Sequence, residues 1–136
     1  MLLANKRIFM VEDNLNNKAI TEMLLEREGA RVVSDRWGVG IIERLRKFAP
    51  TDIILMDLML PREVSGYDIF QQIRQLTEFD GVPVVALSAA DASTAVPRAQ
   101  MMGFTGFISK PIDFRLFPHQ IRWIIEGKAV WATEQL

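Results

Sequence analysis

A small set of acidic, hydroxyl and basic side chains stands at the ends of apolar segments that lie far apart in the chain. The set consists of Glu12, Asp13, Asp57, Ser88 and Lys110. Carboxylates that are held close together repel each other and raise one another's pKa unless a cation joins them. Hard oxygen ligands at a shallow, wet site suit Mg²⁺, and a lysine offsets part of the negative charge. The chemistry that these residues could do is therefore metal-dependent and should lie beside Asp57.

The apolar segments that precede these side chains are typical of buried parallel strands. Ile53 to Met56 is a continuous apolar run between Asp52 and Pro61, as expected for a central strand that is covered on both faces. A lone carboxylate directly after such a strand lies where open α/β sheets bind their ligands. Further strand candidates are 6–11, 30–34, 82–87 and 104–109.

Apolar residues at helical spacing separate the strands. Asn14 can cap the first helix, which places Ile20, Met23 and Leu24 on one face and ends at Gly29. Two more helices are expected over 41–49 and from Ile69 to about Phe79. The fourth should begin near Pro97, because proline cannot donate an intrahelical hydrogen bond, and Asp113 should cap a last helix whose first turn is distorted at Pro118.

Five strands that alternate with five helices predict an α/β fold with a doubly wound, five-stranded parallel sheet and right-handed crossovers. In such a sheet the carboxyl ends of all strands lie along one edge. The candidate side chains should therefore converge, although they span almost the whole sequence.

Composition favours one globular domain, which we assign to residues 1–127, followed by a short C-terminal tail at 128–136. With 16 basic and 17 acidic residues the net charge is -1, so nucleic-acid binding has no electrostatic support. Cysteine is absent, which excludes disulfides and thiol catalysis. The apolar stretch in the first residues is too short for a signal peptide or a membrane span, and we expect a cytoplasmic protein.

Four motifs in this order resemble the receiver domain of two-component response regulators, the family of the chemotaxis receiver and of stand-alone cell-cycle regulators. They are VEDN at Val11 to Asn14, MDLMLP at Met56 to Pro61, LSAA at Leu87 to Ala90 and FISKP at Phe107 to Pro111. The resemblance covers about Lys6 to Gly127. It implies a flavodoxin-like sheet with strand order 2-1-3-4-5.

The resemblance also implies the roles of the site residues. Asp57 is the expected phosphoacceptor, with Lys110 pairing a phosphoryl oxygen and Ser88 moving to bond another. Phe107 would then turn inward, as the second half of a coupled switch. The Mg²⁺ ligands would be Asp13, Asp57 and the Met59 backbone carbonyl, with Glu12 acting through water. Such a protein is a signalling receiver that catalyses only its own aspartyl phosphorylation and dephosphorylation.

The implied partners are a histidine kinase or a histidine phosphotransfer protein. A downstream target or a second copy would bind the face built from 97–126, on which Leu116 and Trp123 should be half exposed. We read His119 as a surface residue and neither as a ligand nor as a phosphodonor. The resemblance further predicts a cis peptide between Lys110 and Pro111.

The sequence departs from the family pattern at three places. Four residues, Arg62 to Ser65, separate Pro61 from Gly66 where the family usually has three. Phe107 replaces a frequent tyrosine or histidine, and Pro97 falls within the helix that usually transmits the switch.

Three other classes of function are alternatives to a phosphoacceptor receiver. An aspartyl phosphatase would need a second acid where Met59 stands, and a nucleotide- or flavin-binding sheet would need a glycine-rich first turn, which EDNLNN lacks. A receiver fold that acts as an interaction module without phosphorylation remains the open alternative.

Overall fold

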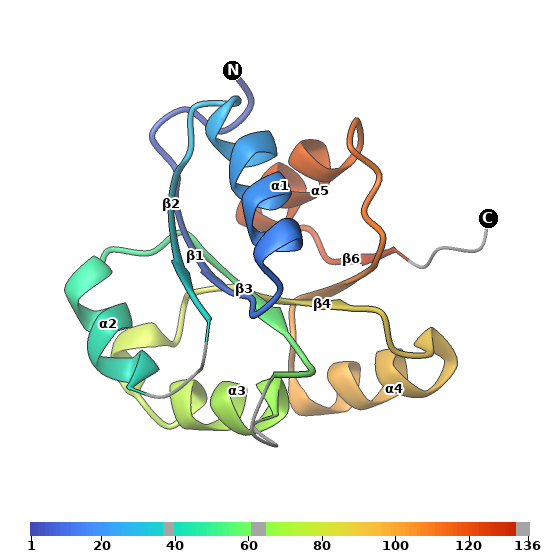
Figure 1. Ribbon diagram of the computed structural model, residues 1–136. Coiled ribbons are helices and arrows are strands. Elements are labelled where there is room, and N and C mark those ends of the chain that lie inside the picture. The colour runs from blue at the N-terminus through green and yellow to red at the C-terminus, as the bar shows by residue number, and fades with distance from the viewer. Residues whose placement is uncertain (37–39, 61–64, 133–136) are drawn as a thin grey trace.

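The computed structural model describes residues 1–36, 40–60 and 65–132, which form one parallel sheet between two layers of helices (Figure 1). The strands are β1 (Arg7–Val11), β2 (Arg31–Asp35), β3 (Ile53–Asp57), β4 (Val84–Ser88), β5 (Gly106–Ser109) and β6 (Val130–Ala132). The helices are α1 (Leu15–Glu26), α2 (Ile41–Phe48), α3 (Gly66–Arg74), α4 (Ala92–Met102) and α5 (Phe117–Ile125), with a 3-10 turn, η1, at Thr77–Phe79. None of the described helices is long and apolar enough to cross a lipid bilayer.

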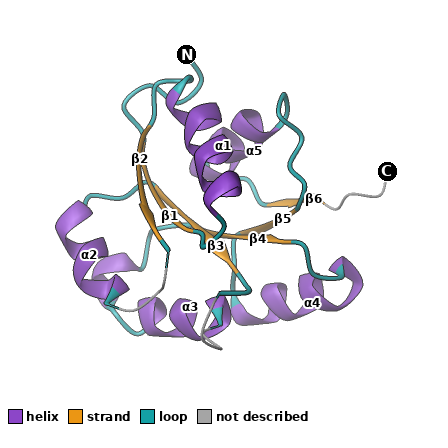
Figure 2. Cartoon of the chain, in the orientation of Figure 1, coloured by secondary structure: helices purple, strands orange, loops and turns teal. Residues whose placement is uncertain are grey.

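The central strands are apolar on both faces because helices cover both sides of the sheet (Figure 2). On β3, Ile53 and Leu55 face the core shared with α1 and α5, whereas Ile54 and Met56 face the core shared with α2, α3 and α4. All four side chains are fully buried. The uninterrupted apolar run of β3 thus reflects its place in the middle of the sheet.

The strand order is β2-β1-β3-β4-β5-β6, and every pair is parallel. The first five strands confirm the predicted order 2-1-3-4-5. The sixth strand was not predicted, since we expected residues 128–136 to form only a short tail. Three residues are too few to show a strand period in the sequence, and β6 is recognisable only from its pairing with β5.

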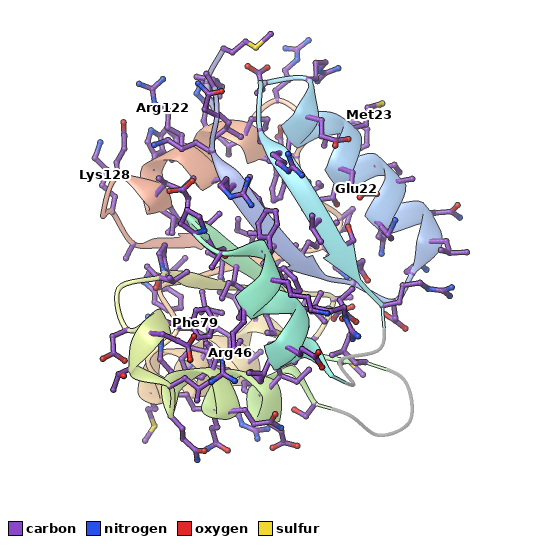
Figure 3. The ribbon with its side chains drawn as sticks, turned by 90° about the vertical axis from the view of Figure 1, so that its left-hand side faces the viewer. Glu22, Met23, Arg46, Phe79, Arg122 and Lys128 are labelled. Carbon is purple, nitrogen blue, oxygen red and sulfur yellow. The ribbon has the colours of Figure 1, made fainter. Side chains whose placement is uncertain are left out.

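The cap of α1 is as predicted, but one residue of its buried face is not. The Asn14 side chain accepts a hydrogen bond of 2.9 Å from the Asn17 amide. The buried residues are Thr21, Leu24 and Leu25, while Met23 is 52% exposed and projects outward (Figure 3). The prediction that Met23 lies on the buried face was wrong. The spacing of apolar residues did not show that Thr21, a polar residue, takes a buried position on this helix.

The prediction that the fourth helix begins near Pro97 was also wrong. Helix α4 starts at Ala92, where the Asp91 carboxylate accepts from the Ser93 amide, and contains Pro97 in its interior. Proline at this position leaves the Ser93 carbonyl without its usual partner. Both residues lie on the exposed side of α4, opposite the buried Ala95 and Ala99, so water can solvate that carbonyl.

The last helix begins later than predicted. Asp113 Oδ1 accepts from the amides of Arg115 and Leu116, each at 2.9 Å, and so caps the turn that precedes α5. The helix itself starts at Phe117, with Pro118 in its first turn. Proline needs no N–H there, and the predicted distortion is therefore unnecessary.

Replacing Pro97 with alanine should stabilise the fold. Alanine restores an amide that can bond to the Ser93 carbonyl, and the expected increase in the free energy of unfolding is about 1–2 kcal/mol, after allowing for the lost rigidity of proline in the unfolded chain. Urea unfolding followed by circular dichroism measures it. Gln100→Ala, an exposed substitution on the same helix, should change stability by less than about 0.5 kcal/mol. A Pro97→Ala protein no more stable than the parent would contradict this account of α4.

Candidate functional site

The carboxyl edge of the sheet gathers the predicted side chains. Glu12 and Asp13 directly follow β1, and Asp57 ends β3. One carboxylate oxygen from each of these three residues lies within 4.8 Å of the others. Glu12 is 1% exposed and Asp57 is 6% exposed, so two of the three acids are almost completely removed from water. The sequence prediction of an acidic cluster at this edge is confirmed.

Lys110, which follows β5, is the cation of the cluster. Its Nζ lies 2.6 Å from Glu12 Oε1 and 3.2 Å from Asp57 Oδ2. The lysine therefore bridges the acids of β1 and β3 from across β4. Because its side chain is itself largely buried, at 16% exposed, the attraction is screened much less than in a surface ion pair.

Backbone groups fix the rotamers of both buried acids. Asp57 Oδ1 accepts a hydrogen bond of 3.0 Å from the Met59 amide, and Glu12 Oε2 accepts one of 3.2 Å from the Asn14 amide. These bonds leave Asp57 Oδ2 facing Lys110 and orient the two carboxylates toward each other.

Gly66 is a site residue whose role the sequence analysis did not identify. It opens α3, and a Cβ built on it would lie 2.2 Å from the Asp57 carbonyl oxygen and 2.9 Å from Leu58 Cα. Only glycine lets the start of α3 approach the end of β3 this closely. The glycine directly after the predicted loop was the feature of the sequence that could have indicated this close approach. Of that loop, Pro61 to Val64 lie outside the described residues, so the extra residue of Arg62 to Ser65 stays a sequence observation.

Ser88 lies where β4 ends, completely buried. Its Oγ accepts a hydrogen bond of 3.0 Å from the Ala90 amide, while its carbonyl accepts one of 2.9 Å from the Lys110 amide. The peptide that follows, between Lys110 and Pro111, is cis as predicted. Ser88 therefore belongs to the same edge as the acids and is tied to the loop that leads into α4.

Phe107 is fully buried, in the core between the sheet and the helices α2, α3 and α4. The family resemblance predicts that Phe107 turns inward on phosphorylation, whereas its side chain is already buried in this structure. Leu116 and Trp123 are 38% and 37% exposed, which confirms the prediction that they are half exposed. His119 is exposed and lies beside Trp123, with ring centroids 6.1 Å apart, as expected for a surface residue.

The surroundings of Asp57 shift the pKa of its carboxyl group. Burial raises the pKa of its carboxyl group from 3.8 to about 6; Glu12 adds to the rise, while the Met59 amide and the Lys110 charge oppose it. A cation bound next to Asp57 would stabilise the ionised form of this carboxyl group and lower its pKa.

The three acids fit a magnesium ion. Mg²⁺ holds oxygen ligands at about 2.0–2.1 Å in an octahedron, which puts ligand oxygens about 3 to 4 Å apart. Oxygens already within 4.8 Å of one another reach that spacing by small side-chain rotations. The participation of the Met59 carbonyl stays a prediction.

An apolar cleft of about 150 Å³ opens next to the cluster, between α1 and the segment after β5. Its walls include Ile20 of α1 together with Pro111 and Phe114, and Lys110 stands at one side of it. Phe114 is 53% exposed. The cleft offers an apolar contact surface directly beside the charged site.

Comparison with known proteins gives concordant results. The family model described as the response regulator receiver domain matches residues 8–122. The polar-differentiation response regulator DivK of Brucella ovis is 32% identical over 117 residues, which cover 86% of this chain and 94% of that protein.

Two solved structures show the same fold. A putative response regulator from Chloroflexus aurantiacus has a TM-score of 0.82 at 20% identity, with coverage of 90% of this chain and 98% of the other. The chemotaxis protein CheY4 of Vibrio cholerae has a TM-score of 0.79 at 18% identity, with coverage of 88% and 98%.

Replacing Asp57 with asparagine should stabilise the metal-free protein at neutral pH. The pKa of Asp57 is higher in the folded protein than in the unfolded chain, so protonation of this group favours the folded state at low pH. As the pH rises from 3.8 to about 6 this contribution to the free energy of unfolding is lost, and above about 6 the ionised group lowers stability. At about 1.4 kcal/mol for each pKa unit, the asparagine removes a penalty of up to roughly 3 kcal/mol. Urea unfolding in a chelator at about pH 7.5 and about pH 4 measures this, with a clearly smaller gain at the lower pH.

Asp68→Asn, at an exposed acid in the first turn of α3, is the matched control and should leave stability nearly unchanged at both pH values. An Asp57→Asn gain that does not depend on pH would show that the effect is not electrostatic.

Proposed function

The chain belongs to the response regulator receiver domain family, and we propose that Asp57 is its phosphoacceptor in a two-component phosphorelay. The observation that carries this proposal is the convergence of Glu12, Asp13 and Lys110 on the Asp57 carboxylate. A general acidic patch would be open to water, whereas Asp57 is buried and in contact with a lysine.

The phosphoryl transfer follows from these positions. An Asp57 carboxylate oxygen attacks phosphorus, the bond from phosphorus to the donor's histidine nitrogen breaks, and that nitrogen keeps the electron pair. Lys110 Nζ, 3.2 Å from Oδ2, then pairs with a phosphoryl oxygen. Bound Mg²⁺ would supply screening of the repulsion between two anions. Asp13 and Asp57 would hold it directly and Glu12 through water, with the Met59 carbonyl as a further ligand.

The output is a change of conformation that begins in the loop between β4 and α4. We propose that Ser88 exchanges its bond to the Ala90 amide for one to a phosphoryl oxygen, which moves the start of α4. The protein acts as a switch and catalyses only its own phosphorylation and dephosphorylation. We place it in the cytoplasm.

The two partner classes would use different surfaces. The apolar cleft at Ile20, Pro111 and Phe114 suits a histidine kinase or a histidine phosphotransfer protein, because it lies beside Lys110 and the donor must reach Asp57. A downstream target or a second copy would bind the face between Pro97 and Glu126, where Trp123 and Leu116 are half exposed.

Replacing Asp13 with alanine should weaken Mg²⁺ binding strongly, because the ion then loses one of its direct oxygen ligands. Loss of a second-sphere group typically costs about tenfold in metal affinity, so loss of a direct ligand should cost at least that much. Isothermal titration with Mg²⁺ measures the affinity, and Glu26→Ala, at an exposed acid on α1, is the control. Unchanged affinity in Asp13→Ala would remove Asp13 from the metal site.

Phosphorylation itself is tested by mass spectrometry of the intact protein after incubation with Mg²⁺ and acetyl phosphate. The parent should gain one phosphoryl group, a chelator should prevent it, and Asp57→Ala should abolish it. Lys110→Ala should reduce the adduct strongly, because the transferred charge loses its cationic partner.

Asp68→Ala should be phosphorylated like the parent, since Asp68 is exposed on α3. Absence of an adduct, or an adduct that survives Asp57→Ala, would refute the phosphoacceptor role and favour the alternative of an interaction module that works without phosphorylation.

A further inference from the structure

The C-terminal strand β6 occupies the edge of the sheet that β5 would otherwise form. Gly106, Phe107 and Ile108 of β5 pair with Val130, Trp131 and Ala132 of β6, in parallel register. In Figure 1, β6 lies at the margin of the sheet beneath α5. Backbone groups of β5 that would face water in a five-stranded sheet are thus paired within the chain.

Local features of the sequence build this strand into the fold. Gly127 adopts a φ of 98° and donates to the Ile124 carbonyl, while the Lys128 amide donates to the Trp123 carbonyl, so the chain turns back from α5 toward β5. On the opposite strand, a Cβ at Gly106 would lie 2.6 Å from the Val130 carbonyl oxygen. Glycine at position 106 is what allows β6 to approach.

The pairing places Trp131 directly beside Phe107. Partners in a parallel register point to the same face of the sheet, and both side chains pack in the core formed with α2, α3 and α4. Phe107 is fully buried, whereas Trp131 is partly buried and lies one strand further out. Without β6, Phe107 would stand on the edge strand with an open side toward solvent.

We propose that Trp131 is a positioning residue that holds Phe107 in its buried position, and that β6 thereby supports the phosphorylated state of Asp57. This inference rests on the proposed function, because it assumes that Phe107 must be inward when Ser88 engages the phosphoryl group. Docking of β6 removes the outward alternative for Phe107 in advance. The phosphorylated state then no longer has to overcome that alternative.

Linkage gives the direction of the effect. If docking of β6 favours the conformation that the phosphoryl group needs, the phosphoryl group and docked β6 stabilise each other by one coupling factor. Removing the Trp131 ring should then weaken binding of a phosphoryl mimic at Asp57 by that factor. The route is short: Phe107 pairs with Ala86 on β4, two residues before Ser88. Coupling between Trp131 and the site therefore passes through adjacent residues of neighbouring strands.

The test uses full-length variants and beryllofluoride, an unreactive phosphoryl mimic, titrated in saturating Mg²⁺ and followed by fluorine NMR. Trp131→Ala should bind it at least about fivefold more weakly, the lower end of typical coupling between sites. Trp131→Phe, which keeps an aromatic ring, should recover most of the affinity. Met23→Ala, at an exposed large apolar side chain of α1, should bind like the parent.

Gly106→Ala is a second variant that acts on the strand and keeps tryptophan at position 131 of the sequence. Its Cβ meets the Val130 carbonyl, so β6 should undock, and beryllofluoride binding should weaken as in Trp131→Ala. Hydrogen exchange over 106–109 and 130–132 reports the docking of β6 and should be faster in both variants. A merely structural role of Trp131 would speed exchange and lower stability without moving the affinity.

The outcomes separate this inference from the proposed function. A parent that binds no beryllofluoride refutes the phosphoacceptor proposal, and exchange over 106–109 then still decides whether Trp131 secures this edge. A parent that binds, with unchanged or tighter binding in Trp131→Ala, overturns the inference alone. Weakening in Gly106→Ala but not in Trp131→Ala would assign the effect to the strand and overturn the role of the tryptophan.

Discussion

The contact of Lys110 with Glu12 and Asp57 is the interaction on which the site depends. The carboxylates of Glu12 and Asp57 are only 1% and 6% exposed, so water screens their charges poorly. Without a cation between them they would repel each other strongly. One lysine cannot neutralise three acids, and the cluster keeps a negative charge that suits a divalent ion. Burial is the main cause of the raised pKa of Asp57, and the neighbouring Glu12 adds to it.

The parallel sheet is what makes this contact possible. Glu12 and Lys110 are 98 residues apart in sequence and meet because their strands end at the same edge. The close approach of Gly66 to Asp57 then fixes the wall on the α3 side, and the Ala90 amide holds Ser88 on the α4 side. Backbone contacts thus position Gly66 and Ser88 on either side of the cluster, while the oxygens of Asp57 and Glu12 are held by backbone amides and by Lys110.

The lateral edge of the sheet beside β5 is closed by the chain itself. There the chain returns after α5 and closes the sheet with its own C-terminal strand, so that Phe107 lies inside the core. The resemblance predicted that Phe107 turns inward on phosphorylation, whereas its side chain is already buried in this structure. Trp123 of α5 and Leu116, which precedes that helix, are half exposed and are not covered by β6.

The sequence by itself determined the first five strands and the edge where the candidate side chains gather, because continuous apolar runs specify buried parallel strands. The motifs at the strand ends gave the family resemblance, which implied the strand order. The sequence could not decide features that arise from contacts between distant segments. Met23 faces solvent because Thr21 takes the buried position, and Pro97 is tolerated inside α4 because its unpaired carbonyl partner is exposed. Strand β6 exists because Gly106 admits the Val130 backbone. Local patterns record which residues avoid water, whereas only the packed structure decides which of them meet.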